Sequence, residues 1–384
     1  MQKRRKIKQL VTLVVGARPN FMKIAPIIRA IEKSKGQLSY RLVHTGQHKD
    51  KEMNSVFFQE LDIPEPSVYL KGGGVTHAEQ TATIMVEFER DCVEYKPDMV
   101  LVVGDVNSTV ACAIVAKKLH IKLAHVESGL RSGDRDMPEE INRLVVDAIS
   151  DLLFVTEPSG VENLLREGHS ATNIHYVGNV MIDNLFYQNN KLNTYSDCNF
   201  PSTLLKGSLK RYAVLTLHRP SNVDNQEIFK EIVRAINYIS LEVPIIFPVH
   251  PRTIASIKKF NIKFNQRVHL VSPMPYLEFL NIWKDSEVVL TDSGGLQEET
   301  TALGVRCITI RNNTERPITV EKGTNVLAGV DCNNIIEVFS RTIANKINKI
   351  ISVVKRLAVS VVEFCCIRKK GPHSSVILRR PNFV

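Results

Sequence analysis

The sequence contains no long hydrophobic run. Although 43% of its 384 residues are hydrophobic, runs such as residues 10–15 are far shorter than the roughly 20 apolar residues of a transmembrane helix. Basic residues 3–8 precede this run as they would in a signal peptide, but the run ends at Gly16 without a small-residue cleavage site. We therefore predict a cytoplasmic protein with no membrane partner.

Cysteine is sparse and follows no metal-binding pattern. The seven cysteines are an odd number, and no C-x-x-C occurs, so neither a disulfide framework nor a zinc site is expected. His125 and Glu127 match half of the zinc-deaminase signature, but the required P-C-x-x-C is missing. The sequence also lacks G-x-G-x-x-G and P-loop motifs, and therefore has no recognisable nicotinamide fingerprint.

The net charge of +10 is confined to the ends of the chain. Residues 1–8 and 364–384 each hold five Lys or Arg and no acidic residue, which leaves 40 basic and 40 acidic residues between them. A nucleic-acid site needs a basic patch on a folded face with interleaved aromatic residues. Basic end segments are more typical of solvated tails, so we expect no nucleic-acid partner.

Short apolar runs alternate with longer helical patterns, which is typical of βαβ units whose parallel sheets are covered on both faces. We predict an α/β protein with two Rossmann-like, doubly wound parallel-sheet domains, residues 1–178 and 179–354, facing a central cleft that binds ligands at the strand ends. The predicted strands are residues 11–16, 40–45, 99–104, 122–126, 152–156, 212–217, 243–249, 268–272, 288–291 and 307–310, and predicted helices include 22–33, 107–119 and 227–239.

Acidic residues follow predicted strands of the first domain. Asp105 is one such residue, and if Asn107 or Ser108 caps the next helix, Asp105 is free to face the cleft. Glu127 is another, and a buried carboxylate at that position needs a partner or a raised pKa. Either condition suits general acid–base catalysis. These strand ends predict an enzyme that moves protons.

Two further acids, Glu139 and Glu140, follow Pro138 at a predicted helix start. Helix stability alone explains proline and acids in a first turn. Adjacent residues do not share a helical face, so at most one of the two carboxylates faces the cleft.

Cationic and glycine-rich segments also end predicted strands. Arg18 and Lys23 lie at a helix start that suits an anionic group such as phosphate, although solvated charges explain them equally well. His218 and His250, each close to an arginine, end two strands of the second domain and favour phosphate contacts.

The segment Ser293-Gly294-Gly295 connects a predicted strand to a helix. Its glycines let backbone N–H groups approach an anion. Glu299 follows in that helix and could reach ribose hydroxyls, and Arg316 belongs to a further polar strand end.

The motifs GARPNFMKIAP, TGQH, GDVNST, HVESGLRS, MPEEINR, VGNVMID, HRPSN, PVHPR, DSGGLQEE and RNNTERP stand in this order between Gly16 and Asn325. Together they closely resemble the non-hydrolysing UDP-N-acetylglucosamine 2-epimerases. The resemblance implies the glycosyltransferase-B arrangement of two Rossmann-like domains, a homodimer, and no metal or nicotinamide cofactor.

The resemblance also implies the reaction. A base removes the C2 proton of UDP-N-acetylglucosamine while UDP leaves C1, and the resulting glycal takes up a proton on its other face and UDP again. The acid–base residues implied are Asp105, Glu127, Glu139 and His218, without an assignment of individual protons. The substrate-binding residues implied are Arg18, Lys23, His218, His250, Ser293, Gly294, Gly295, Glu299 and Arg316.

Two departures from the family pattern stand out. Gln47 and His48 match residues that bind an activating second substrate in some members, but Asp50 and the arginine-free residues 71–75 argue against such activation here. Residues 355–384 lack the family's closing turn and the helix that packs back on the first domain, as an altered reading frame would explain.

Three alternatives remain from the sequence. The first is the same chemistry on a modified UDP-sugar such as a diacetamido uronic acid. The second is a glycosyltransferase, which shares the architecture but needs no carboxylate trio. The third is a catalytically weak UDP-sugar-binding homologue, if the atypical tail prevents closure of the two domains.

Overall fold

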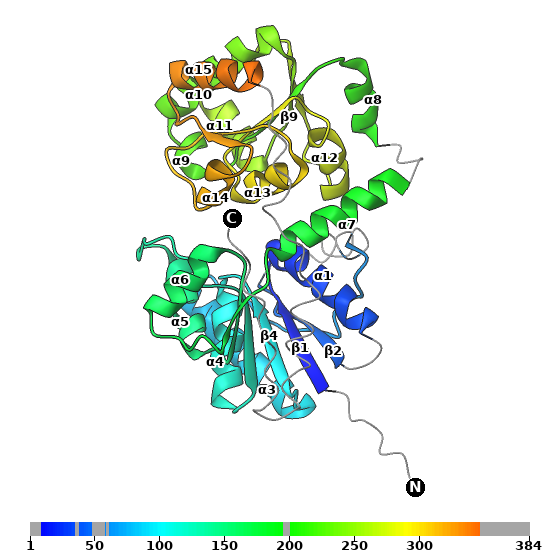
Figure 1. Ribbon diagram of the computed structural model, residues 1–384, viewed down its shortest axis with the longest axis vertical. Helices are drawn as coiled ribbons and strands as arrows, with labels where there is room; N and C mark the ends of the chain where they lie inside the picture. The colour runs from blue at the N-terminus through cyan, green and yellow to red at the C-terminus, as the bar shows by residue number, and fades with distance from the viewer. Residues whose placement is uncertain (1–8, 35–37, 48–57, 59–60, 195–199, 346–384) are drawn as a thin grey trace. The chain divides into compact units, whose positions relative to one another are not determined.

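The computed structural model describes residues 9–34, 38–47, 58, 61–194 and 200–345 (Figure 1). They belong to two compact units, one ending at Val180 and the other beginning at Met181. Each unit contains one parallel sheet, which confirms the predicted pair of Rossmann-like α/β domains. The atypical segment 355–384 and His48 lie outside the described residues.

The first domain has strand order β3-β2-β1-β4-β5-β6-β7. Its strands and helices are β1 (Gln9–Val15), α1 (Arg18–Lys33), β2 (Leu38–His44), β3 (Val68–Tyr69), α3 (His77–Tyr95), β4 (Met99–Val103), α4 (Asn107–Lys118), β5 (Lys122–Ser128), α5 (Pro138–Ile149), β6 (Leu152–Val155), α6 (Pro158–Arg166) and β7 (Ile174–Tyr176). The strand order reverses direction between β1 and β4, so this is the topological switch point at which doubly wound sheets bind ligands.

The second domain has strand order β10-β9-β8-β11-β12-β13, and its switch point lies between β8 and β11. Its elements are α7 (Val180–Thr194), α8 (Pro201–Ser208), β8 (Ala213–Thr216), α9 (Pro220–Val223), α10 (Gln226–Glu242), β9 (Ile245–Pro248), α11 (Pro251–Lys259), β10 (Val268–Val271), α12 (Tyr276–Trp283), β11 (Val288–Thr291), α13 (Gly294–Leu303), β12 (Cys307–Thr309), α14 (Pro317–Glu321), β13 (Asn325–Leu327) and α15 (Cys332–Ala344).

Both faces of the second sheet are buried. Along β11, Val288 and Leu290 pack with α9, α10 and α15, whereas Val289 packs with α7, α12 and α13. Figure 1 shows α10 and α15 on one side of the strands and α12 on the other. Successive side chains of a strand point to opposite faces, so the continuous apolar strands seen in the sequence are explained by helices on both sides.

All ten predicted strands are present, with ends that differ by one or two residues. The strands β3, β7 and β13 were not predicted. They have only two or three residues each and lie at sheet edges, where one neighbour suffices and no long apolar run is needed.

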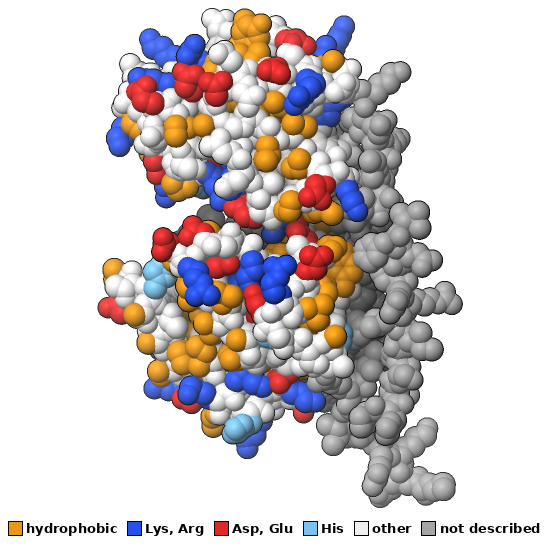
Figure 2. Space-filling view, turned by 60° about the vertical axis from the view of Figure 1, so that its left-hand side comes forward, with side chains coloured by type: hydrophobic (Ala, Val, Ile, Leu, Met, Phe, Trp, Pro, Cys, Tyr) orange, Lys and Arg blue, Asp and Glu red, His pale blue; other side chains and the backbone are white. Residues whose placement is uncertain are grey.

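The described surface carries both signs of charge. Figure 2 shows basic and acidic side chains interspersed on the face in view. Among the described residues, no helix is long and apolar enough to cross a membrane. The described cysteines Cys92, Cys112, Cys307 and Cys332 are free and buried, as expected for reduced thiols.

Candidate active site

An ion pair joins two predicted site residues at the switch point of the first sheet. The ammonium group of Lys23, on the second turn of α1, contacts Oε2 of Glu127 in β5. Both side chains are 12% exposed, so the pair is largely shielded but still open to a ligand. Of the two conditions that the sequence predicted for a buried Glu127, a partner or a raised pKa, Lys23 provides a partner.

The backbone at Glu127 is unusual. Its φ is +75°, and the pairing of β5 with β6 shifts register between Val126 and Ser128. A side chain in this left-handed region costs about 1–2 kcal/mol. A bulge of this kind re-aims a side chain at a strand end, and such strain is concentrated at functional sites.

Asp105 lies beside this pair but is not free. Arg143 of α5 donates from Nε and a terminal nitrogen to Asp105 Oδ2, at 3.0 and 2.7 Å, and Asn142 donates to the Asp105 carbonyl at 2.8 Å. The predicted cap was wrong: the residue before α4 is Val106, whose side chain makes no capping bond. Asp105 is therefore fixed by α5, although its side chain remains 27% exposed.

The residues predicted as caps have other partners. Asn107 donates to Gln80 Oε1 at 2.8 Å, and the Ser108 backbone N–H donates to Gln47 Oε1 at 3.0 Å. Gln47, which matches an activator-binding residue of some family members, thus accepts from a backbone N–H at the start of α4. A helix terminus with free N–H groups needs such an acceptor from elsewhere when its own cap provides none.

A buried chain of hydrogen bonds supports the turn that carries Asp105. His125 in β5 is fully buried, and its ring nitrogens lie 2.9 Å from the Gly104 carbonyl oxygen and 2.7 Å from Asp147 Oδ1. The carbonyl can only accept, so Nε2 carries the proton in that bond. Burial alone would raise the pKa of Asp147, but His125, Arg131 and the Gly129 N–H outweigh it and lower that pKa.

The two acids at the start of α5 differ in their surroundings. Glu140 is buried and accepts from the Ser132 and Gly133 N–H groups and from Arg143. Burial raises its pKa, yet these donors outweigh burial and hold the pKa below its usual value. Glu139 is partly exposed and has no hydrogen-bond or ion-pair partner among the described residues. Glu139 is therefore the better placed to meet a ligand.

Gly104 provides the space in which Lys23 and Glu127 meet. Its φ is +67°, and an added Cβ would lie 3.0 Å from Lys23 Nζ and 3.5 Å from Glu127 Oε2. We expect Gly104→Ala to lose about 1–2 kcal/mol of stability through the backbone and, because Lys23 must move, to lower kcat by about tenfold or more. The matched control is Gly168→Ala, since φ there is +87° and an added Cβ meets nothing within 4 Å. Thermal unfolding and steady-state kinetics of both variants test this, and equal kcat values would contradict it.

In the second domain, Asp292 organises the loop after β8. Its fully buried carboxylate accepts from the His218 and Arg219 N–H groups, each at 2.9 Å, and lies 2.9 Å from His218 Nδ1. Because Nδ1 faces a carboxylate, Nε2 is left toward solvent as the reactive ring nitrogen. His218 is 41% exposed, which leaves it accessible.

His250 stacks loosely on His218, with ring centroids 5.8 Å apart. Its Nδ1 accepts from the Arg252 N–H at 3.2 Å and so caps α11. Burial, together with the charges of His218 and Arg252, lowers the pKa of His250. A neutral ring that accepts at Nδ1 carries its proton on Nε2, which can donate to an anion.

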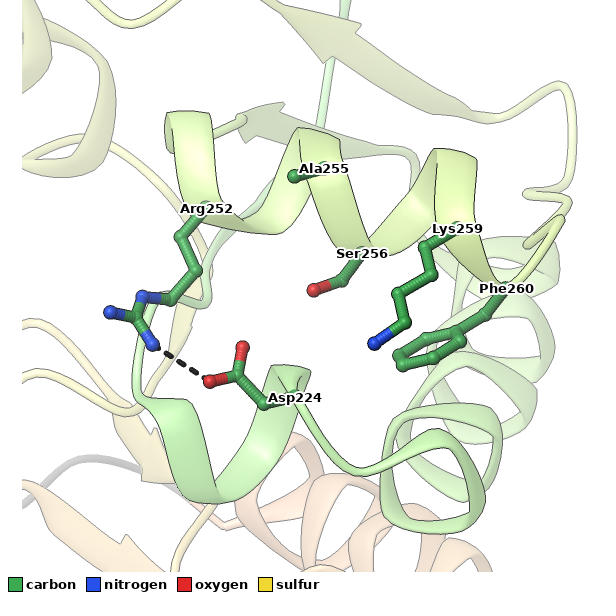
Figure 3. A pocket seen from close by; sticks show the side chains of 6 residues that line it. All are labelled: Asp224, Arg252, Ala255, Ser256, Lys259 and Phe260. Carbon is green, nitrogen blue, oxygen red and sulfur yellow. Dashed lines mark hydrogen bonds and ion pairs between the residues drawn. The ribbon is translucent and has the colours of Figure 1, made fainter.

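The Arg252 side chain does not join His218 and His250 but pairs with Asp224. Its guanidinium donates to Asp224 Oδ2 at 2.7 Å, the bond drawn as a dashed line in Figure 3. A hollow of about 420 Å³ lies along α11 beside this pair. The hollow is lined by Asp224, Arg252, Ala255, Ser256, Lys259 and Phe260. None of the predicted site residues lines it, so the hollow is separate from the predicted nucleotide site.

The start of α13 carries the predicted glycine-rich anion site. Ser293 precedes the helix and makes no side-chain cap, and added Cβ atoms would meet nothing within 4 Å at Gly295. At Gly294 an added Cβ would lie 3.8 Å from Glu315 Oε2 and 3.9 Å from an Arg219 nitrogen. A helix start, an open backbone and a nearby guanidinium together suit a phosphate group.

Arg219 is held by Glu315. Glu315 lies 3.4 Å from Arg219 and accepts two bonds of 2.8 Å from Arg311. The Arg311 bonds are the main reason that the pKa of Glu315 falls to about 2, despite the opposing effect of burial. The three groups carry a net positive charge beside the start of α13, although the sequence motif alone did not identify Glu315.

The two remaining predicted residues lie on or against α13. Arg316 lies 3.2 Å from Glu298 Oε1. Glu299 is buried and accepts from the Tyr276 hydroxyl at 2.8 Å. Burial, assisted by the charge of Glu298, raises the pKa of Glu299 to about 7 although the Tyr276 bond lowers it.

This raised pKa predicts a pH-dependent stability. The unfolded chain loses the Glu299 proton near pH 4.5, but the folded chain does so only near pH 7, so ionisation destabilises the fold as pH rises through this window. Above pH 7 the cost is about 3 kcal/mol. We expect Glu299→Gln to be more stable than wild type at pH 8 and equally stable at pH 5 by urea unfolding. The exposed Glu231→Gln control should show no such difference, and a pH-independent effect of Glu299→Gln would contradict the prediction.

Several residues that shape the candidate site were not predicted from the sequence. Arg143 and Asn142 belong to the MPEEINR motif. Their place one turn after Glu139 on the same predicted helix could have indicated that they lie near the site. The partner of His125, Asp147, and the partner of Glu299, Tyr276, had no local signal. Arg18 begins α1, and the structure describes no more of it than its backbone. Among the described residues, no cluster of His, Cys, Asp or Glu could hold a metal ion.

Comparison with known proteins gives consistent matches. The family model described as UDP-N-acetylglucosamine 2-epimerase matches residues 29–356. A Methanocaldococcus jannaschii UDP-N-acetylglucosamine 2-epimerase is 44% identical over 85% of this chain and 90% of its own length. A Pseudomonas aeruginosa UDP-2,3-diacetamido-2,3-dideoxy-D-glucuronate 2-epimerase is 39% identical over 85% and 90%. The crystal structure of the M. jannaschii UDP-GlcNAc 2-epimerase with UDP-GlcNAc and UDP matches at a TM-score of 0.80 and 40% identity, over 93% of this chain and 99% of that one.

Proposed function

Because this chain belongs to the UDP-N-acetylglucosamine 2-epimerase family and is an isomerase, we propose that it converts UDP-N-acetylglucosamine to UDP-N-acetylmannosamine by elimination and re-addition of UDP. The observation that carries the proposal is the Lys23–Glu127 pair beside Asp105 at the switch point of the first sheet. The bound UDP-GlcNAc of the M. jannaschii structure supports the choice of substrate.

In the proposed reaction a carboxylate takes the C2 proton. The electrons of the C2–H bond form the C1–C2 double bond, and those of the C1–O bond leave with the β-phosphate of UDP. A proton is then delivered to the opposite face of C2, and the UDP oxygen attacks C1 again. The C2 proton is not acidic by itself, so stabilising the departing diphosphate lowers the barrier.

The first domain supplies the proton-transfer groups. Glu127, with Lys23 as its counterion, and Asp105, held by Arg143, are fixed carboxylates at one sheet edge. Glu139 has no described partner that would have to be displaced. One proton is removed from one face of C2 and another is added to the opposite face, and separate carboxylates can serve the two faces.

The second domain supplies the diphosphate grip. His218 presents Nε2, because its Nδ1 lies against Asp292. His250 presents an Nε2–H, and the start of α13 presents the backbone N–H groups of Ser293, Gly294 and Gly295. These donors act where negative charge develops as UDP leaves.

The decisive experiment is incubation with UDP-N-acetylglucosamine in D2O, followed by NMR. The expected result is deuterium at C2 and a UDP-linked manno product. Free N-acetylmannosamine with UDP would indicate a hydrolysing enzyme instead. UDP binding without exchange at C2 would contradict the catalytic proposal and favour a binding protein.

A second candidate substrate is a UDP-diacetamido uronic acid. The Pseudomonas aeruginosa relative named for this activity is 39% identical over 85% of the chain, nearly as similar as the first relative. The same NMR experiment with both nucleotide sugars decides between them, because the true substrate should show the larger kcat/KM.

A further inference from the structure

Tyr276 and Glu299 form a contact that the proposed reaction does not yet use. Tyr276 is the first residue of α12, and Glu299 lies in the middle of α13. The tyrosine hydroxyl donates to Glu299 Oε1 at 2.8 Å. Oε2 of Glu299 makes no hydrogen bond among the described residues, so one carboxylate oxygen is held and the other remains for a ligand.

The direction of this hydrogen bond is well defined. Burial and the adjacent carboxylate raise the pKa of Tyr276 well above its ordinary value, so the hydroxyl keeps its proton and donates. The ring packs at the border of the apolar cluster formed by α7, α12, α13 and the sheet. A tyrosine whose ring is packed in a core cannot move away, so its hydroxyl can restrict a bonded carboxylate to one rotamer.

We propose that Tyr276 is a positioning residue that holds Glu299 in the orientation in which its second oxygen accepts from the ribose of the bound nucleotide. This inference rests on the proposed function and on the expectation from the sequence that Glu299 reaches the ribose hydroxyls of the bound nucleotide. An acidic side chain that accepts from a ribose hydroxyl is a common feature of nucleotide-binding Rossmann domains. Tyr276 itself touches no reacting atom.

The hydrogen bond also affects the charge of Glu299. It favours the ionised carboxylate, whereas burial and Glu298 favour the protonated form. Removal of the tyrosine hydroxyl therefore raises the pKa of Glu299 above about 7. At neutral pH more of the protein then carries a protonated Glu299, which is a poorer acceptor for a ribose hydroxyl.

The test compares Tyr276→Phe with Tyr212→Phe in the full chain. Tyr212 is a matched control because its hydroxyl donates to the Ile282 carbonyl at 2.7 Å within the same apolar cluster, away from Glu299. Both variants lose one hydroxyl and one hydrogen bond, so a purely structural effect should be similar in the two. UDP binding is measured by calorimetry from pH 6 to pH 8.5, together with KM and kcat.

We expect Tyr276→Phe to weaken UDP binding about tenfold or more at pH 7. The pH at which UDP binding is half-maximal should move upward, and KM should rise with kcat nearly unchanged. Tyr212→Phe should match wild type in all three measurements. A carbon-13 carboxyl resonance assigned through Glu299→Gln reports the Glu299 titration directly, and it should shift to higher pH in Tyr276→Phe only.

Two results would overturn the inference in distinguishable ways. If wild type binds UDP and Tyr276→Phe binds it with the same affinity and pH profile, Tyr276 has only a structural role while the proposed function stands. If wild type does not bind UDP at all, the proposed function fails and the positioning role fails with it.

Discussion

Glu127→Gln is expected to lower kcat by about a thousandfold, within the range typical of a lost acid–base group. The amide can neither accept nor return the C2 proton. It also removes the charge of the carboxylate that pairs with Lys23, whose side chain is only 12% exposed. Two effects therefore coincide in one side chain, because the carboxylate proposed to transfer the proton is also the ion-pair partner of the lysine.

The measurement is kcat together with deuterium incorporation at C2, on protein whose circular dichroism matches wild type. The control is Glu87→Gln, which breaks an ion pair with Arg90 on α3 where Glu87 is 26% exposed. This control should retain wild-type kcat, since partly exposed helical pairs contribute little. If Glu127→Gln kept more than about a tenth of the activity, Glu127 would not be a proton-transfer group.

Asp292→Ala is expected to have the largest effect in the second domain. The fully buried carboxylate accepts from two backbone N–H groups and orients His218, and its removal leaves these donors without an acceptor. We expect a loss of about 4 kcal/mol in the free energy of unfolding. Since His218 loses its anchor, kcat/KM should fall by about a hundredfold or more.

Calorimetry and kinetics of Asp292→Ala check both parts of this prediction. Asp285→Ala is the matched control, because Asp285 pairs with Lys206 but is 50% exposed. Its loss should cost at most about 1 kcal/mol and leave activity unchanged. Equal stability of the two variants would show that the buried network around Asp292 does not support the loop after β8.

The architecture was readable from the sequence because it follows from local periodicity. Apolar runs with helices between them define a parallel sheet, and the ten predicted strands all formed. The short edge strands β3, β7 and β13 carry no such run, since their pairing depends on a neighbour already in place. The predicted cap of α4 failed because Ser108 met Gln47, a residue 61 positions away.

The identity of the candidate site residues was likewise fixed by sequence: residues that end strands in a doubly wound sheet must gather at one edge. Which of these residues pair with one another could not be predicted from the sequence. Lys23 and Glu127 are 104 residues apart, and Asp292 and His218 are 74 apart. Such pairs exist only because the strand order places β1 and β5 on either side of β4, and β8 beside β11.

The sequence by itself therefore determined the two parallel sheets, the family, and which strand ends carry acids and which carry cations and glycines. Only the tertiary structure decided that Glu127 has Lys23 as a counterion, that Asp105 is held by Arg143, and that Tyr276 holds Glu299. The physical reason is range. Periodicity and turn chemistry act over a few residues, whereas a charge or a buried carboxylate responds to whatever the completed fold places within about 3 Å of it.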